Sequence, residues 1–243
     1  MVKFKIALAI GACMLINHTT AQYTYFSNAY NTDGQNEIST NIIVSDSTYQ
    51  MFGIRFYSGN TVLNSRSIDS DGTPTSLNML TVEDYFYYFI NFAESVVRLE
   101  DGSFVWGLTA DGFTDYGAFG AKISSDFSSV EWSLLFPADS LALPAFELAY
   151  ELNSGDLIFA GPNHKNTDDD QWYEYSEMFL VKTTPDGTLI WDHKLEVYDD
   201  QFFRVNQIFE MDNGDLLVFG SVYHDWDQII LRVSAEGDSI LWK

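Results

Sequence analysis

Short apolar runs separated by polar turns recur four times along the chain and predict its organisation. In the fourth copy, Asn213-Gly214 predicts a tight turn, because both residue types tolerate positive φ. Residues 216–219 then form a continuous apolar run, as in a strand buried on both faces. Two further strands are expected at 229–233 and 240–242, on either side of a turn at Glu236-Gly237.

The third copy repeats this order closely, with turns at Ser154-Gly155 and 185–187 and a closing Trp191. The second copy has a degenerate second turn at Asp126, and the first copy lacks a closing Trp. Each copy is preceded by one more apolar stretch, so every unit is expected to hold four strands. These stretches are residues 42–44, 96–99, 148–152 and 205–211.

The spacing of the copies favours a propeller. Gly53, Gly107, Gly161 and Gly220, taken as strand-ending glycines, are separated by 54, 54 and 59 residues. Tandem four-stranded units near this period are typical of propeller blades, and each must stack on its neighbours to bury both faces. A β-sandwich has no such period, and a β-solenoid usually has a shorter one.

The sequence therefore predicts an all-β fold, a β-propeller-like array of about four four-stranded antiparallel blades. The blades are expected at roughly 31–80, 93–136, 145–195 and 203–243. Residues 23–30 are expected to form a further strand, and the sequence stops within the last expected strand. Both features favour part of a larger or incompletely closed propeller over a short array with a divergent cap.

A basic residue lies just before each second turn, at Arg66, Lys122, Lys182 and Arg232. We expect a structural role for it, in which the cation pairs with the acid of that turn. The acids concerned are Asp71, Asp126, Asp186 and Glu236.

Residues 1–21 have the features of a signal peptide. Lys3 and Lys5 precede an apolar run at 6–16 that is too short to span a bilayer, and Ala21 ends a stretch of small residues. We expect cleavage before Gln22 and a mature domain of residues 22–243. The alternative is a lipoprotein modified at Cys13, which lies inside the apolar run. Cys13 is the single cysteine, so the mature domain would hold no thiol site or disulfide.

The composition and charge of the chain limit the classes of partner that it can bind. The net charge is −23, with 35 acidic residues against 12 basic ones, and nucleic acid binding needs clusters of Lys and Arg. Nucleic acid and anionic membranes are therefore excluded, and no membrane insertion of the mature chain is expected. The chain is 46% hydrophobic and 16% aromatic, which argues for a packed core despite the charge.

The repeat resembles that of large secreted bacterial β-propeller proteins with DGGYxxxG units. The resemblance is carried by 212–220 (DNGDLLVFG), 153–161 (NSGDLIFAG) and 100–107 (EDGSFVWG), and by the closing pieces 184–191 (TPDGTLIW) and 234–242 (SAEGDSILW). It implies export from a Gram-negative bacterium, often by type IX secretion, to the cell surface or medium, with the periplasm as the alternative. No C-terminal sorting domain accompanies it here.

Candidate metal ligands lie in the expected loops. His164 and His224 follow equivalent glycines of adjacent blades, so with Asp168 or Asp225 they could bind zinc. Asp168 and Asp170, or Asp69 and Asp71, offer oxygen ligands for a structural Ca²⁺, although neither run matches a full EF-hand loop. The alternative interpretation is that these are surface histidines and turn-forming acids, with no cofactor bound.

Aromatic residues in the same loops are the remaining candidates for ligand binding. Trp172, Tyr173, Tyr223 and Trp226 neighbour the histidines and could stack on a sugar or anchor a peptide, or could simply cover the blade edge. We expect a non-catalytic binding or scaffold module whose partner is a glycan or a cell-surface protein. The alternative is a glycan-cleaving hydrolase or lyase that uses carboxylates at the propeller rim.

Overall fold

The computed structural model describes most of the chain from residue 37 onwards. The described residues are 37–45, 48–57, 60–81, 85–87, 95–112, 116–138, 142–165, 176–197, 203–222 and 227–243. All regular structure in these residues is β, arranged as four antiparallel sheets. Among them, no helix is long and apolar enough to cross a membrane.

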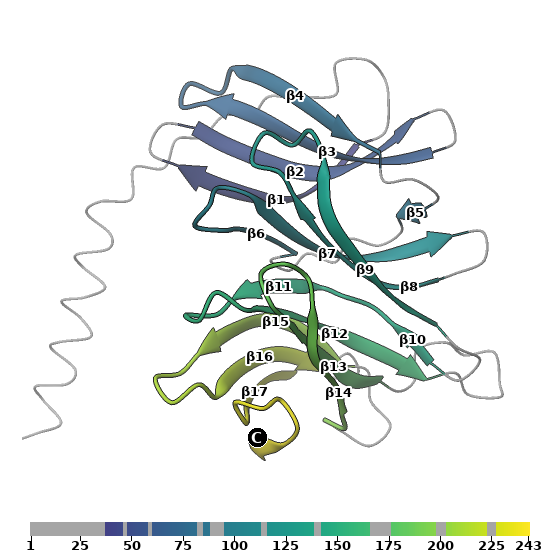
Figure 1. Ribbon diagram of the computed structural model, residues 1–243, viewed down its shortest axis with the longest axis vertical. Helices are drawn as coiled ribbons and strands as arrows, with labels where there is room; N and C mark the ends of the chain where they lie inside the picture. Colours follow the sequence, from purple (N-terminus) through teal and green to yellow (C-terminus); the bar gives the residue numbers. More distant parts are fainter. Residues whose placement is uncertain are drawn as a thin grey trace, which may run out of the picture.

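The four sheets follow one another along the chain and stack from β1–β4 at one end to β15–β18 at the other (Figure 1). Blade 1 contains β1 (Glu37–Ser45), β2 (Thr48–Tyr57), β3 (Asn60–Asp69) and β4 (Pro74–Leu80). Blade 2 contains β5 (Tyr85–Tyr87), β6 (Val96–Arg98), β7 (Phe104–Gly112), β8 (Tyr116–Ile123) and β9 (Val130–Pro137).

Blade 3 contains β10 (Ala142–Pro144), β11 (Leu148–Glu151), β12 (Leu157–Lys165), β13 (Ser176–Thr183) and β14 (Leu189–Leu195). Blade 4 contains β15 (Phe203–Glu210), β16 (Leu216–Val222), β17 (Asp227–Val233) and β18 (Ile240–Trp242). The predicted all-β, propeller-like array of four-stranded antiparallel blades is confirmed.

The first strand of every blade is irregular. In blades 2 and 3 it is divided into two segments that both pair with the second strand, β5 and β6 with β7, and β10 and β11 with β12. In blades 1 and 4 it is continuous but bulged, at 39–41 and 205–207. The first strands β6, β11 and β15 contact one another in turn, so these irregularities gather along one inner line of the array.

The hydrophobic core lies between blades rather than within them. One cluster joins blades 1 and 2 around Phe52 and Trp106, a second joins blades 2 and 3 around Phe159, and a third joins blades 3 and 4 around Leu180 and Val218. Each sheet is a single layer, so only a neighbouring blade can bury its faces. Within the described residues, no core cluster joins blade 4 to blade 1.

Strand register corrects the predicted alignment of the glycines. Phe104, paired with Ile123, matches Leu157, paired with Thr183, so Leu108 and not Gly107 is equivalent to Gly161. These glycines also lie within strands and do not end them. At Gly161 a Cβ would lie 2.2 Å from the carbonyl oxygen of Ala145, so this glycine lets the first strand approach closely.

The closing tryptophans join consecutive blades. Trp132 of blade 2 packs on Gly187 in the second turn of blade 3, where a Cβ would lie 2.6 Å from the indole. Trp191 packs in the same way on Gly237 of blade 4, where the corresponding distance is 2.3 Å. A side chain at either glycine would displace the indole, so tryptophan and glycine occur together at these interfaces.

The junction of blades 1 and 2 is packed in a different way, without a closing tryptophan. Register places Ser76 of blade 1 where the later blades have tryptophan, because it lies opposite Ser67 as Trp132 lies opposite Lys122. The degenerate second turn of blade 2 then holds Phe127 at the glycine position, with φ of 60°. Phe127 is buried against Phe52, so a side chain from the turn itself fills the space.

Candidate functional site

The candidate site lies between blades 3 and 4, where the first strand of blade 3 is interrupted. Between β10 and β11, the amide of Ala145 donates to the carbonyl of Pro162 (2.9 Å) and the amide of Glu147 donates to that of Ala160 (2.8 Å). These two bonds hold the interrupted segment against β12. They leave the Glu147 side chain directed at the first strand of blade 4, which it reaches at Val205.

Glu147 is a buried carboxyl group, with 1% of its surface exposed. Its Oε2 accepts a hydrogen bond from the amide of Val205 (3.1 Å), and its Oε1 lies 3.9 Å from Nε of Arg204. Burial raises the pKa of Glu147 to about 7, because loss of hydration outweighs the opposing effects of Arg204 and the Val205 amide. Glu147 is therefore about half protonated near neutral pH.

His164 lies on the same side of blade 3 as Glu147. It sits near the end of β12, opposite Leu143 of β10. Burial, together with the smaller effect of the positive charge of Arg204, lowers the pKa of His164 to about 4. His164 is consequently neutral at physiological pH, while Arg204 remains charged.

Together these side chains form a small polar cluster with three different chemical capacities. Glu147 can hold or release a proton near neutral pH, His164 is a neutral imidazole, and Arg204 is a permanent cation. The Arg204 side chain is 35% exposed, so the cluster reaches solvent through it. A carboxyl group with a raised pKa beside a cation is suited to donating a proton to a bound substrate.

A second polar pair, in which Asn163 is buried and Glu177 is partly exposed, lies on the opposite face of the same strands. Asn163 precedes His164, so its side chain points the other way, towards blade 2. The Nδ2 of Asn163 donates to Oε2 of Glu177 (3.1 Å). Glu177 therefore does not share a face with Glu147, and the two glutamates do not form a pair.

The residues predicted from sequence to form a site are brought together only in part. His164 is described and belongs to the cluster above. Asp69 and Asp71 are also described and lie in the second turn of blade 1. The remaining candidates lie outside the described residues: Asp168, Asp170, Trp172, Tyr173, Tyr223, His224, Asp225 and Trp226. Within the described parts of the chain, no three His, Cys, Asp or Glu side chains group as they would around a metal ion.

Sequence reasoning missed Glu147 and Arg204. One pattern could have indicated Glu147, since it lies five residues before Leu152 and Glu94 lies five residues before Leu99 at the same point of the preceding copy. Glu94 itself is outside the described residues. The sequence around Arg204 shows no such repeated position. Arg204 belongs to the site because the fold brings it close to Glu147 of blade 3.

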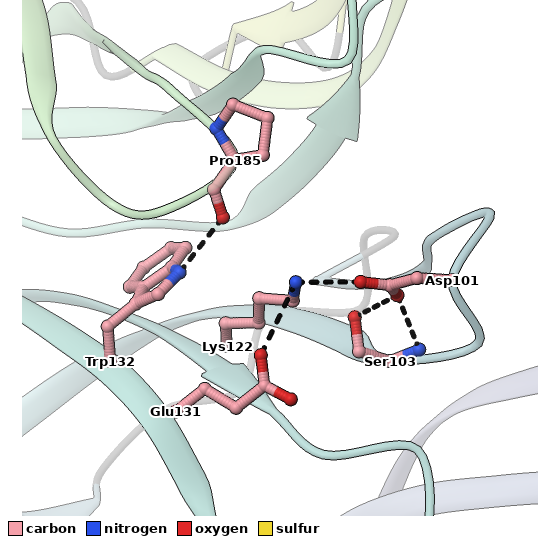
Figure 2. A network of polar contacts seen from close by, with 6 residues as sticks. All are labelled: Asp101, Ser103, Lys122, Glu131, Trp132 and Pro185. Atoms are coloured by element: carbon pink, nitrogen blue, oxygen red, sulfur yellow. Dashed lines mark hydrogen bonds and ion pairs between the residues drawn. The ribbon is translucent and has the colours of Figure 1, made fainter.

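At the turn end of the blades, a different polar network surrounds Lys122 (Figure 2). Its Nζ lies 2.8 Å from Oδ2 of Asp101 and 3.3 Å from Oε2 of Glu131. Ser103 donates to Oδ1 of Asp101 from its backbone amide (2.8 Å) and from its hydroxyl. The hydrogen bonds from Lys122 and Ser103 lower the pKa of Asp101 to about 2.

This network corrects the predicted pairing of the repeated cations. They pair with acids of the first turn: Lys122 with Asp101, Lys182 with Asp156 (3.1 Å) and Arg232 with Asp215 (2.8 Å). The acids of the second turn instead accept hydrogen bonds within their own turns. These bonds run to Asp71 from Thr73, to Asp126 from Ser128 and to Asp186 from Thr188.

The predicted position of the cation in blade 1 is also wrong by one residue. Ile68 precedes the second turn as Ile123 does in blade 2, so Ser67 and not Arg66 is equivalent to Lys122. Arg66 therefore lies on the opposite face of its sheet, because successive residues of a strand alternate. The Asp69–Gly72 segment proposed for Ca²⁺ forms an ordinary turn, in which the amide of Gly72 donates to Asp69 O (2.9 Å).

Comparison with known proteins supports the architecture. The structure matches that of an endo-arabinase from Bacteroides thetaiotaomicron VPI-5482, with a TM-score of 0.53 and 14% identity over 87% of this chain and 80% of the other. It also matches a putative exo-beta-1,3-galactanase from Bifidobacterium bifidum s17, with a TM-score of 0.49 and 14% identity over 88% of this chain and 75% of the other. No family model and no curated protein matches the sequence.

The comparison corrects our principal functional prediction. We expected a non-catalytic binding or scaffold module, and the finding that overturns it is the fold shared with the endo-arabinase. At 14% identity the likeness shows the fold alone, so any activity has to be argued from this chain's own side chains.

Proposed function

We propose that the protein is a glycan-cleaving hydrolase in which Glu147 is the proton donor. The observation that carries the proposal is the buried Glu147 carboxyl group, whose pKa is raised to about 7 at the inner line of the array. Cleavage of a glycosidic bond requires an acid that is still protonated near neutral pH, and enzymes obtain one by burying a carboxyl group.

Arg204 and His164 would assist this chemistry without taking the proton. Once Glu147 has donated its proton, the guanidinium of Arg204, 3.9 Å away, stabilises the carboxylate that remains. His164 is neutral because its pKa lies near 4, so it can exchange hydrogen bonds with sugar hydroxyls without adding charge. The fold shared with an endo-arabinase supports arabinan as the first substrate to test.

The test is release of reducing sugars from arabinan, galactan and a panel of other polysaccharides. Glu147→Gln keeps the size of the side chain and a hydrogen-bond acceptor for Val205, but it removes the acid. We expect a loss of about 10²–10⁴-fold in activity, typical of removing a general acid. Wild-type activity should also fall as pH rises through about 7, because Glu147 then loses its proton.

The matched control is Glu131→Gln, which removes an equal charge from the exposed turn end. It should retain full activity, and circular dichroism should show both variants folded. A folded Glu147→Gln variant with wild-type activity would exclude Glu147 as the donor. Absence of product from every polysaccharide would contradict the proposed hydrolase activity.

We further propose that the protein is exported and that its signal peptide is cleaved after Ala21. The apolar run at 6–16 supports this proposal, and so does the resemblance of the repeat units to those of secreted propeller proteins. Intact-mass measurement of protein from the producing cells and medium tests this proposal. A mass that begins at Gln22 supports signal cleavage, whereas a lipid adduct on Cys13 supports the lipoprotein alternative.

A further inference from the structure

The first turn of blade 4 carries an Asn-Gly pair, Asn213-Gly214, that the proposed reaction does not use. Asn213 is exposed to solvent, and Gly214 adopts φ of 85° in the predicted tight turn. Asparagine followed by glycine is prone to deamidation, because glycine has no side chain to hinder attack by its own backbone nitrogen on the asparagine side chain. The pair is therefore a candidate site of spontaneous modification.

Deamidation begins when the backbone nitrogen of Gly214 forms a bond to Cγ of Asn213. The bond from Cγ to Nδ2 breaks, ammonia leaves with the proton of the Gly214 amide, and a cyclic succinimide remains. Water then opens the ring at either carbonyl and leaves aspartate or isoaspartate at position 213. The reaction needs no co-reactant except water, but the amide nitrogen and the side chain must both be free to approach each other.

The folded turn engages both reacting groups in other interactions. The amide of Gly214 donates to the carbonyl oxygen of Met211 (2.8 Å). The Nδ2 of Asn213 donates to Oδ2 of Asp215 (2.8 Å), and its Oδ1 accepts a hydrogen bond from the amide of Asp215 (3.3 Å). These hydrogen bonds have to break before the nitrogen can reach Cγ, so the folded turn opposes the reaction.

Asp215, which holds the Asn213 side chain, is itself fixed from two other elements. It is 7% exposed, and its Oδ2 also accepts a hydrogen bond from Nε of Arg232 in β17 (2.8 Å). Its Oδ1 accepts a hydrogen bond from the amide of Ala235 in the second turn (3.1 Å). Because the neighbouring strand and turn both hold this carboxylate, it cannot follow the Asn213 side chain towards Gly214.

The equivalent turns of blades 2 and 3 show what a deamidated turn would lose. In all three turns the glycine amide donates to the carbonyl oxygen three residues earlier, so their positions correspond. Each turn has a single acid at the two positions that flank the glycine: Asp101 with Ser103, Asp156 with Ser154, and Asp215 with Asn213. Deamidation would place a second carboxylate 2.8 Å from Oδ2 of Asp215, and repulsion between the two charges would weaken the turn.

We propose that Asn213 is a latent deamidation site, which Asp215 keeps unreactive in the folded protein. When the turn opens, Asn213 deamidates, and the new charge beside Asp215 hinders the turn from closing again. Opening of this part of blade 4 thus leaves a permanent chemical mark. The proposal rests on the turn alone and is independent of the proposed hydrolase activity.

Peptide mass spectrometry of protein incubated at mildly alkaline pH tests the proposal, because it measures conversion of Asn213 to aspartate and isoaspartate. In the folded wild type we expect a rate at least about a hundredfold lower than in the same protein unfolded in urea, since only the opened turn reacts. Asp215→Ser removes a charge-assisted hydrogen bond from Asn213 and should raise the rate of the folded protein about tenfold. Serine is chosen because Ser103 occupies this position in blade 2.

The matched control is Asp156→Ser, the same change at the equivalent position of blade 3, where Asp156 pairs with Lys182 (3.1 Å). It disturbs an equivalent turn and leaves the surroundings of Asn213 intact, so the rate at Asn213 should not change. Circular dichroism shows whether both variants are folded. If Asp215→Ser does not fold, Arg232→Met takes its place, because it loosens Asp215 without removing it and should also accelerate the reaction.

Acceleration by Asp215→Ser, or by Arg232→Met in its place, without acceleration by Asp156→Ser supports the proposal. A folded wild type that deamidates as fast as the unfolded chain overturns it, because the turn then gives no protection. An unchanged rate in the blade 4 variant overturns it as well. Equal acceleration by the blade 3 and blade 4 variants has the same meaning, since general loosening of the fold would then control the reaction.

Discussion

Two carboxyl groups of this protein lie beside a cation, yet their pKa values are displaced in opposite directions. At the turn end of blade 2, hydrogen bonds from Lys122 and Ser103 lower the pKa of Asp101 to about 2. Between blades 3 and 4, burial raises the pKa of Glu147 to about 7, although Arg204 lies 3.9 Å away. A neighbouring cation alone therefore does not determine the protonation state.

The difference lies in hydration. The Asp101 side chain is 55% exposed, so water still solvates its charge and the cation adds to that stabilisation. Glu147 has lost nearly all its water, and the Val205 amide and the Arg204 guanidinium do not compensate for that loss. The turn end thus holds its ion pairs within single blades, with a solvated carboxylate at Asp101, whereas the inner line keeps a carboxyl group that resists ionisation.

The largest effect should come from removing the cation beside the buried carboxyl group. Arg204→Met keeps an apolar stem but leaves Glu147 without its compensating charge. At pH 8, where Glu147 would ionise, we expect a loss of about 3 kcal/mol in the free energy of unfolding. At pH 5, where Glu147 is protonated, the loss should be clearly smaller. Urea denaturation at the two pH values measures both.

Lys122→Met is the control at the turn end, because it removes a cation from Asp101, whose side chain is 55% exposed. Exposed ion pairs contribute about 0–1 kcal/mol, so its cost should be small and nearly the same at both pH values. Equal costs for Arg204→Met at pH 5 and pH 8 would show that Arg204 does not act through the charge of Glu147.

The next prediction concerns whether Glu147 makes the free energy of unfolding rise or fall with pH. The pKa of Glu147 is about 7 in the folded protein and near 4.5 in the unfolded chain, so the native state holds the extra proton between these values. Its contribution to stability therefore falls as pH rises from about 4.5 to 7. Glu147→Gln removes this loss and should gain on the order of 3 kcal/mol relative to wild type across that window.

Urea denaturation of both proteins at pH 4.5, 6 and 8 measures this difference, in which the contributions of the other acids cancel. Parallel pH profiles for the wild type and Glu147→Gln would contradict a raised pKa at Glu147. They would also remove the physical basis of the proposed proton donor.

The fold could be predicted because blades impose a regular pattern of apolar runs and turns. The detailed alignment was less secure, since it matched residue types rather than strand pairs. Gly107 and Arg66 both lie one position away from the true equivalents, Leu108 and Ser67. A shift of one residue moves a side chain to the other face of a strand, which is how the predicted cation of blade 1 was misplaced.

The site could not be predicted from the same pattern. Glu147 lies in an apolar stretch with no recognisable motif, and its pKa depends on burial in the folded array, where it meets the amide of Val205, 58 residues later. The sequence pattern indicated polar and aromatic residues of the loops and turns instead, and of those only His164 belongs to the cluster around Glu147. Burial of a single carboxyl group is a tertiary property, which requires the stacked blades to be known.

The smallest effect on stability is expected at Asp101, where water already solvates the charge. Lys122→Met should return the pKa of Asp101 towards 3.8, and NMR titration of that carboxyl group can follow the change. Asp101 stabilises the wild type above pH 3.8, and this contribution is lost as pH falls towards 2. Because the Asp101 side chain is 55% exposed and stays solvated, loss of the pair should cost under about 1 kcal/mol at pH 7. If Lys122→Met instead costs as much as Arg204→Met, hydration is not what separates the two carboxyl groups.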